Sequence, residues 1–152
     1  MLPQDKCTGC EACVNICNKN AIQMQPDCNG FLYPTIDVEK CIHCGVCEKR
    51  CPVINVQNTS HEVAFYAARY TEVETLKRVS SGGIASFLYE KCLDDSWVVY
   101  GVVWDKDYSG AHYERATTKD GIKAFAGTKY VQAKKDNIYE LVLNDLTTDR
   151  KV

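Results

Sequence analysis

The chain of 152 residues has no excess of charge of either sign and no long apolar run. Its 18 Lys and Arg against 20 Asp and Glu give a formal net charge of -2, which excludes a strongly basic nucleic-acid binder. The longest apolar run, Trp97 to Trp104, is far too short for a membrane span. The first residues, Met1 to Lys6, contain no apolar core of a secretory signal, so we expect a cytoplasmic protein.

Cysteine is scarce in the second part of the chain, where Cys92 is the only one beyond Cys51. The other nine of the ten cysteines lie at or before Cys51. The composition therefore divides the chain into a cysteine-dense head and an ordinary apolar-patterned body. A head of about fifty residues is too small for a large core and needs cross-links or bound metal for its stability.

Eight of the cysteines form two runs of identical spacing, C-x2-C-x2-C-x3-C. The runs are Cys7, Cys10, Cys13 and Cys17, and Cys41, Cys44, Cys47 and Cys51. This is the spacing of bacterial two-cluster ferredoxins, in which the fourth cysteine of each run ligates the other cluster. Two x2 steps let a tight loop present three thiolates to one cluster, and the x3 step moves one helical turn onward and turns the fourth away.

We therefore predict two 4Fe-4S clusters with crossed ligand sets. Cluster I takes Cys7, Cys10, Cys13 and Cys51, and cluster II takes Cys41, Cys44, Cys47 and Cys17. Disulfides would suit a secreted chain, and zinc sites use pairs of cysteines rather than triplets with a fourth at x3. Cys28 lies outside both runs in a turn sequence and is expected to be a free thiol, and His43 to be a solvated loop residue.

The pattern predicts an α+β two-cluster ferredoxin head followed by a partial α/β domain. In the head we expect short helical turns over residues 13–21 and 45–50 and a type I′ hairpin at Asn29-Gly30. In the body we expect strands at 63–70, 97–104 and 111–116, and helices at 84–93, 118–126 and 136–146. The apolar run 97–104 predicts a strand buried on both faces, and Cys92 is expected in the core.

We place the domains at residues 1–55 and 63–152, with a polar linker at 56–62. Because the alternating pattern would place a strand after the last helix, we expect the body to be incomplete at Val152.

A glycine-rich step, Ser80-Ser81-Gly82-Gly83, precedes the helix expected at 84–93. Serine there can cap the helix, and free N–H groups at such a step can also receive a phosphate. The spacing alone leaves both interpretations open, because it is neither G-x-G-x-x-G nor a Walker loop.

Together with the head, this step, the run 97–104 and the string Gly127-Thr128-Lys129-Tyr130-Val131-Gln132 resemble the coenzyme F420 hydrogenase/dehydrogenase beta-subunit family. The resemblance implies a flavin-binding oxidoreductase body that passes electrons between iron–sulfur clusters, FAD and a deazaflavin or similar acceptor. It also implies FAD in the complete protein. The cofactor contacts it implies are Ser81, Gly82, Gly83, Lys129 and Tyr130.

We interpret the chain as the electron-entry part of a flavin-linked oxidoreductase, working with a redox partner protein or subunit. This fragment alone would be an electron carrier, and no catalytic residue is assigned because no Ser-His-Asp, Cys-His or paired-carboxylate pattern is present. The alternative is a docking or structural module without turnover, since bacterial members that resemble this chain accompany polysaccharide-synthesis enzymes.

Overall fold

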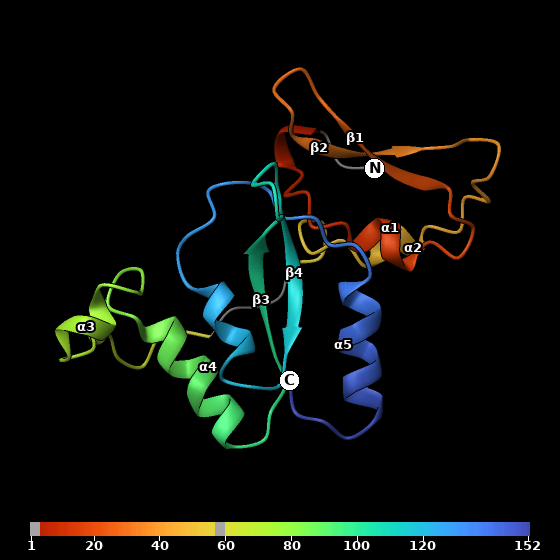
Figure 1. The fold of residues 1–152 in the computed structure, drawn as a ribbon. Helices are drawn as coiled ribbons and strands as arrows, with labels where there is room; N and C mark the ends of the chain where they lie inside the picture. Colours follow the sequence, from red (N-terminus) through yellow and green to blue (C-terminus); the bar gives the residue numbers. More distant parts are fainter. Residues whose placement is uncertain (1–3, 57–59) are drawn as a thin grey trace. The chain divides into compact units, whose positions relative to one another are not determined.

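The computed structural model describes residues 4–56 and 60–152 (Figure 1). The chain divides into two compact units, Met1–Glu62 and Val63–Val152. Each unit has its own two-stranded antiparallel sheet, β1 with β2 in the first and β3 with β4 in the second.

The first unit is a small hairpin with three short helices. Its elements are η1 (Gln4–Lys6), α1 (Ala12–Ile16), β1 (Ile22–Pro26), β2 (Leu32–Ile36) and α2 (Val46–Lys49). Among its described apolar residues only Ala21 and Ile22 are fully buried, at 1% and 5% exposure. So small a core needs another source of stability, as the composition of the head predicts.

The hairpin between β1 and β2 pairs Ile22 with Ile36 and Pro26 with Leu32. The expected hairpin is confirmed, but its turn is not type I′. That turn needs positive φ at two successive residues, whereas only Gly30 has it, at 85°. Instead, the Gly30 N–H donates to the Asp27 carbonyl, and the Asp27 carboxylate accepts from the N–H groups of Asn29 and Phe31. Asp27 therefore organises a longer turn that ends in a left-handed glycine.

The second unit surrounds one hairpin with helices (Figure 1). Its elements are α3 (Val73–Leu76), α4 (Ile84–Asp94), β3 (Val99–Trp104), β4 (Ala111–Ala116), η2 (Gly121–Phe125) and α5 (Ile138–Thr147). The buried core consists of Val99, Val103, Ala116, Ile122 and Phe125, with Tyr89, Cys92 and Leu93 of α4 packed against it. Cys92 is thus a packing residue, as predicted.

Two expectations for the body are wrong. The strand β3 alternates between buried and partly exposed residues, because it pairs antiparallel with β4 and only one face meets the core. The segment 63–70 is not a strand, since nothing in the described part of the chain pairs with it as a ladder. The side chains of residues 63–69 are exposed instead, with Phe65 at 84%.

A buried ion pair attaches α5 to the sheet. Asp145 of α5 is 6% exposed and accepts two hydrogen bonds from Arg115 of β4, at 2.7 and 2.8 Å. The Tyr100 hydroxyl of β3 donates to the same carboxylate at 2.5 Å. These hydrogen bonds, from Arg115 first and then Tyr100, lower the pKa of Asp145 to about 2. Burial and then the carboxylate raise the pKa of Tyr100 to about 12.

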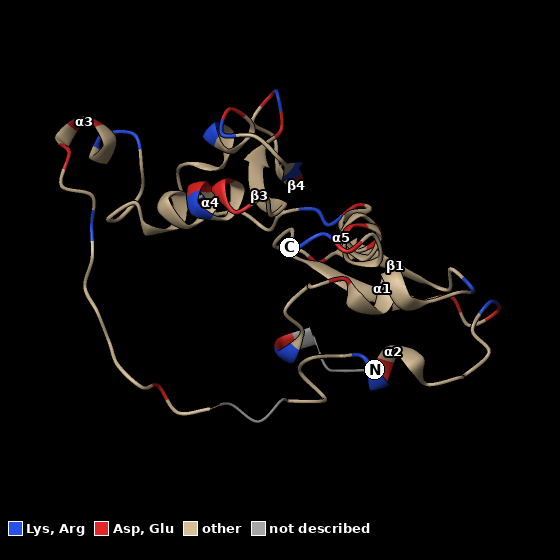
Figure 2. Ribbon diagram, turned by 90° about the horizontal axis from the view of Figure 1, so that it is seen from below, with Lys and Arg blue, Asp and Glu red and all other residues tan. Residues whose placement is uncertain are grey.

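Charges of both signs are interspersed over each unit (Figure 2). Within residues 4–56 and 60–152, no helix has the length and apolar character that crossing a membrane requires.

Candidate iron–sulfur centres

The two cysteine runs follow the same backbone path. In the first run Gly9 and Glu11 both have φ of 62°, and the equivalent residues of the second run, His43 and Gly45, have 54° and 71°. These four left-handed residues lie at matching places: two residues after the first cysteine and one residue after the second. The repeated spacing is therefore a repeated conformation, although glycine occupies a different one of the two places in each run.

Each loop then enters a short helix that carries its third cysteine. Cys13 is the second residue of α1 and Cys47 the second residue of α2. Cys17 caps the end of α1, and Cys51 lies two residues beyond the end of α2. Because α1 and α2 contact one another, the fourth cysteine of each run can reach the loop of the other run.

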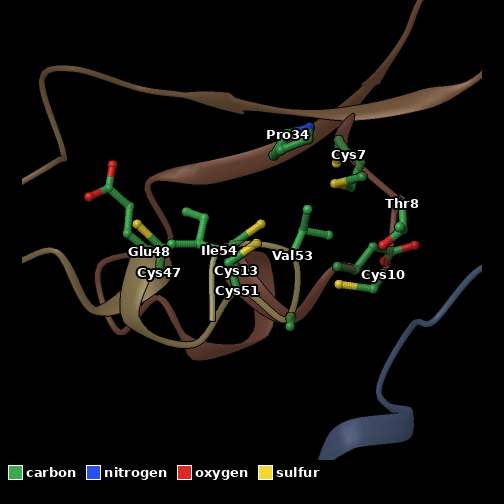
Figure 3. A pocket seen from close by; sticks show the side chains of 13 residues that line it. Cys7, Thr8, Cys10, Cys13, Pro34, Cys47, Glu48, Cys51, Val53 and Ile54 are labelled. Carbon is green, nitrogen blue, oxygen red and sulfur yellow. The ribbon is translucent and has the colours of Figure 1, made fainter. Parts of the chain in front are cut away.

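One pocket collects the four cysteines predicted for cluster I. Cys7, Cys10 and Cys13 line it from the first run and Cys51 from the second, and Cys47 of the second run lines it as well. Figure 3 shows these side chains around the pocket, with Val53 and Ile54 among them. The rest of the wall is mainly apolar and includes Ala12, Met24 and Pro34.

A second pocket collects the four cysteines predicted for cluster II. Cys41, Cys44 and Cys47 line it from the second run and Cys17 from the first. Six aliphatic side chains complete most of the wall: Ile16, Ala21, Ile22, Ile36, Ile42 and Val46. Cys44 is exposed, whereas the other seven cysteines of the two runs are half-buried. Neither lining includes Cys28, which is an exposed thiol in the β1–β2 turn.

The donor set of each pocket fits a 4Fe-4S cluster. Four thiols and apolar walls suit a cubane that takes one thiolate on each iron. Backbone N–H groups also point at sulfur: Gly9 donates to Cys7 Sγ and Ala21 to Cys17 Sγ, each at 3.4 Å. Such bonds stabilise the charge of a bound cluster.

Across residues 4–56 and 60–152, no three His, Cys, Asp or Glu side chains already meet as ligands of a single metal ion. Burial raises the pKa of the Cys13 thiol to about 11.

In the second unit, the structure brings the two family-like motifs together. The Thr128 N–H donates to Ser80 Oγ at 3.1 Å. Gly83, which has a φ of 81°, is the N-cap before the first residue of α4, and no side chain of the described residues caps this helix. Of the two interpretations left open for this step, the serine cap is not found, and Ser80 Oγ accepts from the Thr128 N–H.

The candidate cofactor residues of this unit lie in different surroundings. Ser81 is exposed, Gly82 is half-buried and Gly83 is buried against the preceding chain. The Lys129 ammonium contacts backbone carbonyls at the end of η2. Tyr130 is 91% exposed.

An open hollow lies beside these motifs. Its lining residues are Tyr89, Val102, Tyr113, Phe125, Gly127, Lys129, Val131, Gln132, Ala133 and Lys135. Lys135 Nζ lies 5.4 Å from the centre of the Tyr113 ring, at cation–π distance. Tyr113 and Lys135 are absent from the sequence prediction because they belong to neither motif. Only the fold of β4 and the loop after Lys129 brings them together.

Two cysteine-lined pockets on one small α+β unit define an iron–sulfur protein of the ferredoxin type. Comparison with known families agrees: residues 6–55 match a 4Fe-4S dicluster domain, and a second dicluster family matches residues 33–95. Residues 65–136 match the N-terminal domain of the coenzyme F420 hydrogenase/dehydrogenase beta subunit. The chain therefore joins a 4Fe-4S dicluster domain to the N-terminal domain of that beta-subunit family, as the sequence resemblance indicates.

Two curated relatives come from Methanocaldococcus jannaschii. An uncharacterized polyferredoxin-like protein is 36% identical over 63 residues, covering 36% of this chain and 38% of the relative. An uncharacterized ferredoxin is 38% identical over 52 residues, covering 34% of this chain and 66% of the relative. The matched part thus covers less than two thirds of either relative. These likenesses support iron–sulfur electron transfer.

Proposed function

We propose that this chain relays single electrons through two 4Fe-4S clusters, as the electron-entry part of a flavin-linked oxidoreductase. The observation that carries the proposal is the lining of the two pockets. Each is lined by three cysteines of one run and the fourth cysteine of the other, with Cys47 lining both, and these sets include the four ligands that a crossed dicluster ferredoxin requires for each cluster.

The ligand sets follow from this grouping. Cluster I would be held by Cys7, Cys10, Cys13 and Cys51, and cluster II by Cys41, Cys44, Cys47 and Cys17. The dicluster domain would occupy residues 1–55, and the linker 56–62 would join it to an α/β domain that begins at residue 63. The thiols must stay reduced to bind iron, so we place the working protein in the cytoplasm.

The flavin would lie in the hollow of the second unit. A bound flavin supplies the exchange between single electrons and electron pairs. Tyr113 and Phe125 offer aromatic walls to a planar ring, and Lys135 offers a cation to a phosphate group. The match of residues 65–136 to the beta-subunit domain supports this assignment. The electron acceptor and the partner subunit would be those of a larger assembly.

The experiment is a cofactor analysis of the protein isolated without oxygen. We expect about eight irons and about eight acid-labile sulfides per chain, with visible absorption that dithionite bleaches. Addition of FMN to the reduced protein should reoxidise the clusters and yield reduced flavin. Zinc in place of iron, without sulfide, would overturn the proposal and leave a structural module. Clusters that do not react with FMN would overturn the flavin part alone.

A further inference from the structure

We propose that Lys129, although it is among the residues that line the hollow, is a positioning residue, whose ammonium holds the end of η2 and does not bind the ligand. The neighbouring Thr128 N–H donates to Ser80 Oγ, and this bond together with the ammonium bonds of Lys129 is here called the Lys129 joint. This assignment differs from the cofactor contact that the family resemblance implies for Lys129. Its flavin-binding test rests on the proposed function, and its hydrogen-exchange test does not.

The Lys129 ammonium is already fully used within the protein. Its Nζ donates to the carbonyl oxygens of Ala124, Phe125 and Ala126, at 3.0, 3.1 and 2.9 Å. An ammonium has three N–H donors, so these bonds use all of them. Carbonyls at the end of a helix lack partners within the helix, and a lysine is a suitable cap for them. Burial lowers the pKa of Lys129.

The glycine-rich step is likewise used by the chain itself. A Cβ at Gly82 would overlap the Ala68 carbonyl oxygen, and one at Gly83 would meet the ring of Tyr70. The Tyr70 N–H donates to the Gly82 carbonyl at 2.9 Å. Glycine is needed here because residues 68–70 approach the backbone closely. Residues 68–70 therefore occupy the side of Gly82 and Gly83 on which a side chain would lie, and the Gly83 N–H already donates to the Ser80 carbonyl.

The hydrogen bonds of the Lys129 ammonium determine the position of Phe125, which lines the hollow. The carbonyls that Lys129 binds belong to Phe125 and the residues on either side of it. The Phe125 ring packs against Gly101 of β3 and meets Tyr89 edge-to-face, with the ring centres 5.4 Å apart. Loss of the ammonium would release the end of η2 and with it this aromatic wall.

The flavin-binding test compares two probes, FMN and riboflavin, which differ only by a phosphate. In the full chain, Lys129→Met should weaken binding of both probes by the same factor, because the wall that both would contact is disturbed. Lys135→Met should weaken FMN more than riboflavin, because Lys135 would face the phosphate. If Lys129→Met lowered the affinity for FMN and left that for riboflavin unchanged, Lys129 would contact the phosphate and the proposal would be overturned.

Hydrogen exchange tests the joint without any ligand. In Lys129→Met, the amides of residues 121–126 should exchange about tenfold faster or more, since charge-assisted hydrogen bonds to three carbonyls are lost. Lys123→Met is the matched control, because Lys123 lies on η2 itself and its ammonium pairs with the exposed Asp120. Equal exchange in the Lys129 variant and the wild type would overturn the joint. A chain that binds neither probe would contradict the proposed flavin function and leave this second test to decide.

Discussion

At the scale of single residues, the cysteine runs depend on four left-handed backbone positions. Two of these positions are glycines, Gly9 and Gly45. The other two, Glu11 and His43, adopt the same backbone conformation although they carry a Cβ. A left-handed residue with a Cβ costs about 1–2 kcal/mol relative to its ordinary conformation. The backbone of the head is therefore strained at Glu11 and His43, and this left-handed conformation shapes the loops that carry the thiols.

Gly45 offers the clearest test of this strain. A Cβ there would meet no atom within 4 Å, so only the φ of 71° opposes a side chain. We expect Gly45→Ala to destabilise the iron-loaded head by about 1–2 kcal/mol. Gly45→Asn should lose less stability than Gly45→Ala, because asparagine enters the left-handed region more readily. The urea concentration at which the visible cluster absorption disappears measures both. Equal losses in the two variants would argue against backbone strain.

Asp145 provides the residue-scale prediction for pH. Its pKa in the folded protein, about 2, lies below that of an ordinary carboxyl group. The ionised form therefore stabilises the second unit above about pH 4, and this contribution is lost as the pH falls toward 2. Asp145→Asn should be less stable than the wild type at pH 7, and the difference should shrink as the pH falls.

Tryptophan fluorescence can follow this unit alone, because Trp97 and Trp104 are the only tryptophans and both lie in it. Glu140→Gln is the control, since Glu140 is exposed on the same helix. A difference between wild type and Asp145→Asn that stayed constant from pH 7 to pH 2 would contradict the role of the ionised carboxylate.

At the scale of elements, the segments with a clear period could be predicted from the sequence. The strand at 111–116 and the helix at 84–93 are found, the helix as Ile84–Asp94. The segment 63–70 has strand composition but lacks a neighbouring strand, and pairing is not visible in one sequence. The helix expected at 118–126 shortens to η2, which Lys129 closes with a side chain from outside the helix.

The packing of η2 on β3 depends on Gly101, because a Cβ there would overlap the ring of Phe125. We expect Gly101→Ala to cost about 1–3 kcal/mol through overpacking. Phe125→Leu removes the obstructing ring, so the double variant should be more stable than the sum of the two single losses. Urea unfolding followed by tryptophan fluorescence gives all three values. Strict additivity would show that the two residues do not meet in solution.

At the scale of the whole molecule, the two units differ in how far their candidate sites could be predicted from the sequence. In the first, the cysteine spacing alone predicts which thiols share a pocket, because ligand geometry strongly restricts the chain. In the second, the hollow joins Tyr113, Phe125 and Lys135 from separate elements, and no local pattern links them. The sequence therefore predicts the individual cysteine ligands of the candidate clusters, whereas it indicates a flavin site only through the family resemblance.

The crossed ligand set is the central claim, and two double variants test it most directly. Cys13→Ser with Cys51→Ser removes two proposed ligands of cluster I. Cys13→Ser with Cys17→Ser removes one ligand from each cluster, although both residues lie in one run. Cys28→Ser is the control for loss of a thiol outside both pockets.

The measurement is iron and sulfide content, with the electron paramagnetic resonance spectrum, of each protein prepared without oxygen. The crossed arrangement predicts one intact cluster in the first double variant, with about four irons and about four sulfides, and no intact 4Fe-4S cluster in the second. The opposite result, an intact cluster after loss of Cys13 and Cys17 and none after loss of Cys13 and Cys51, would contradict it.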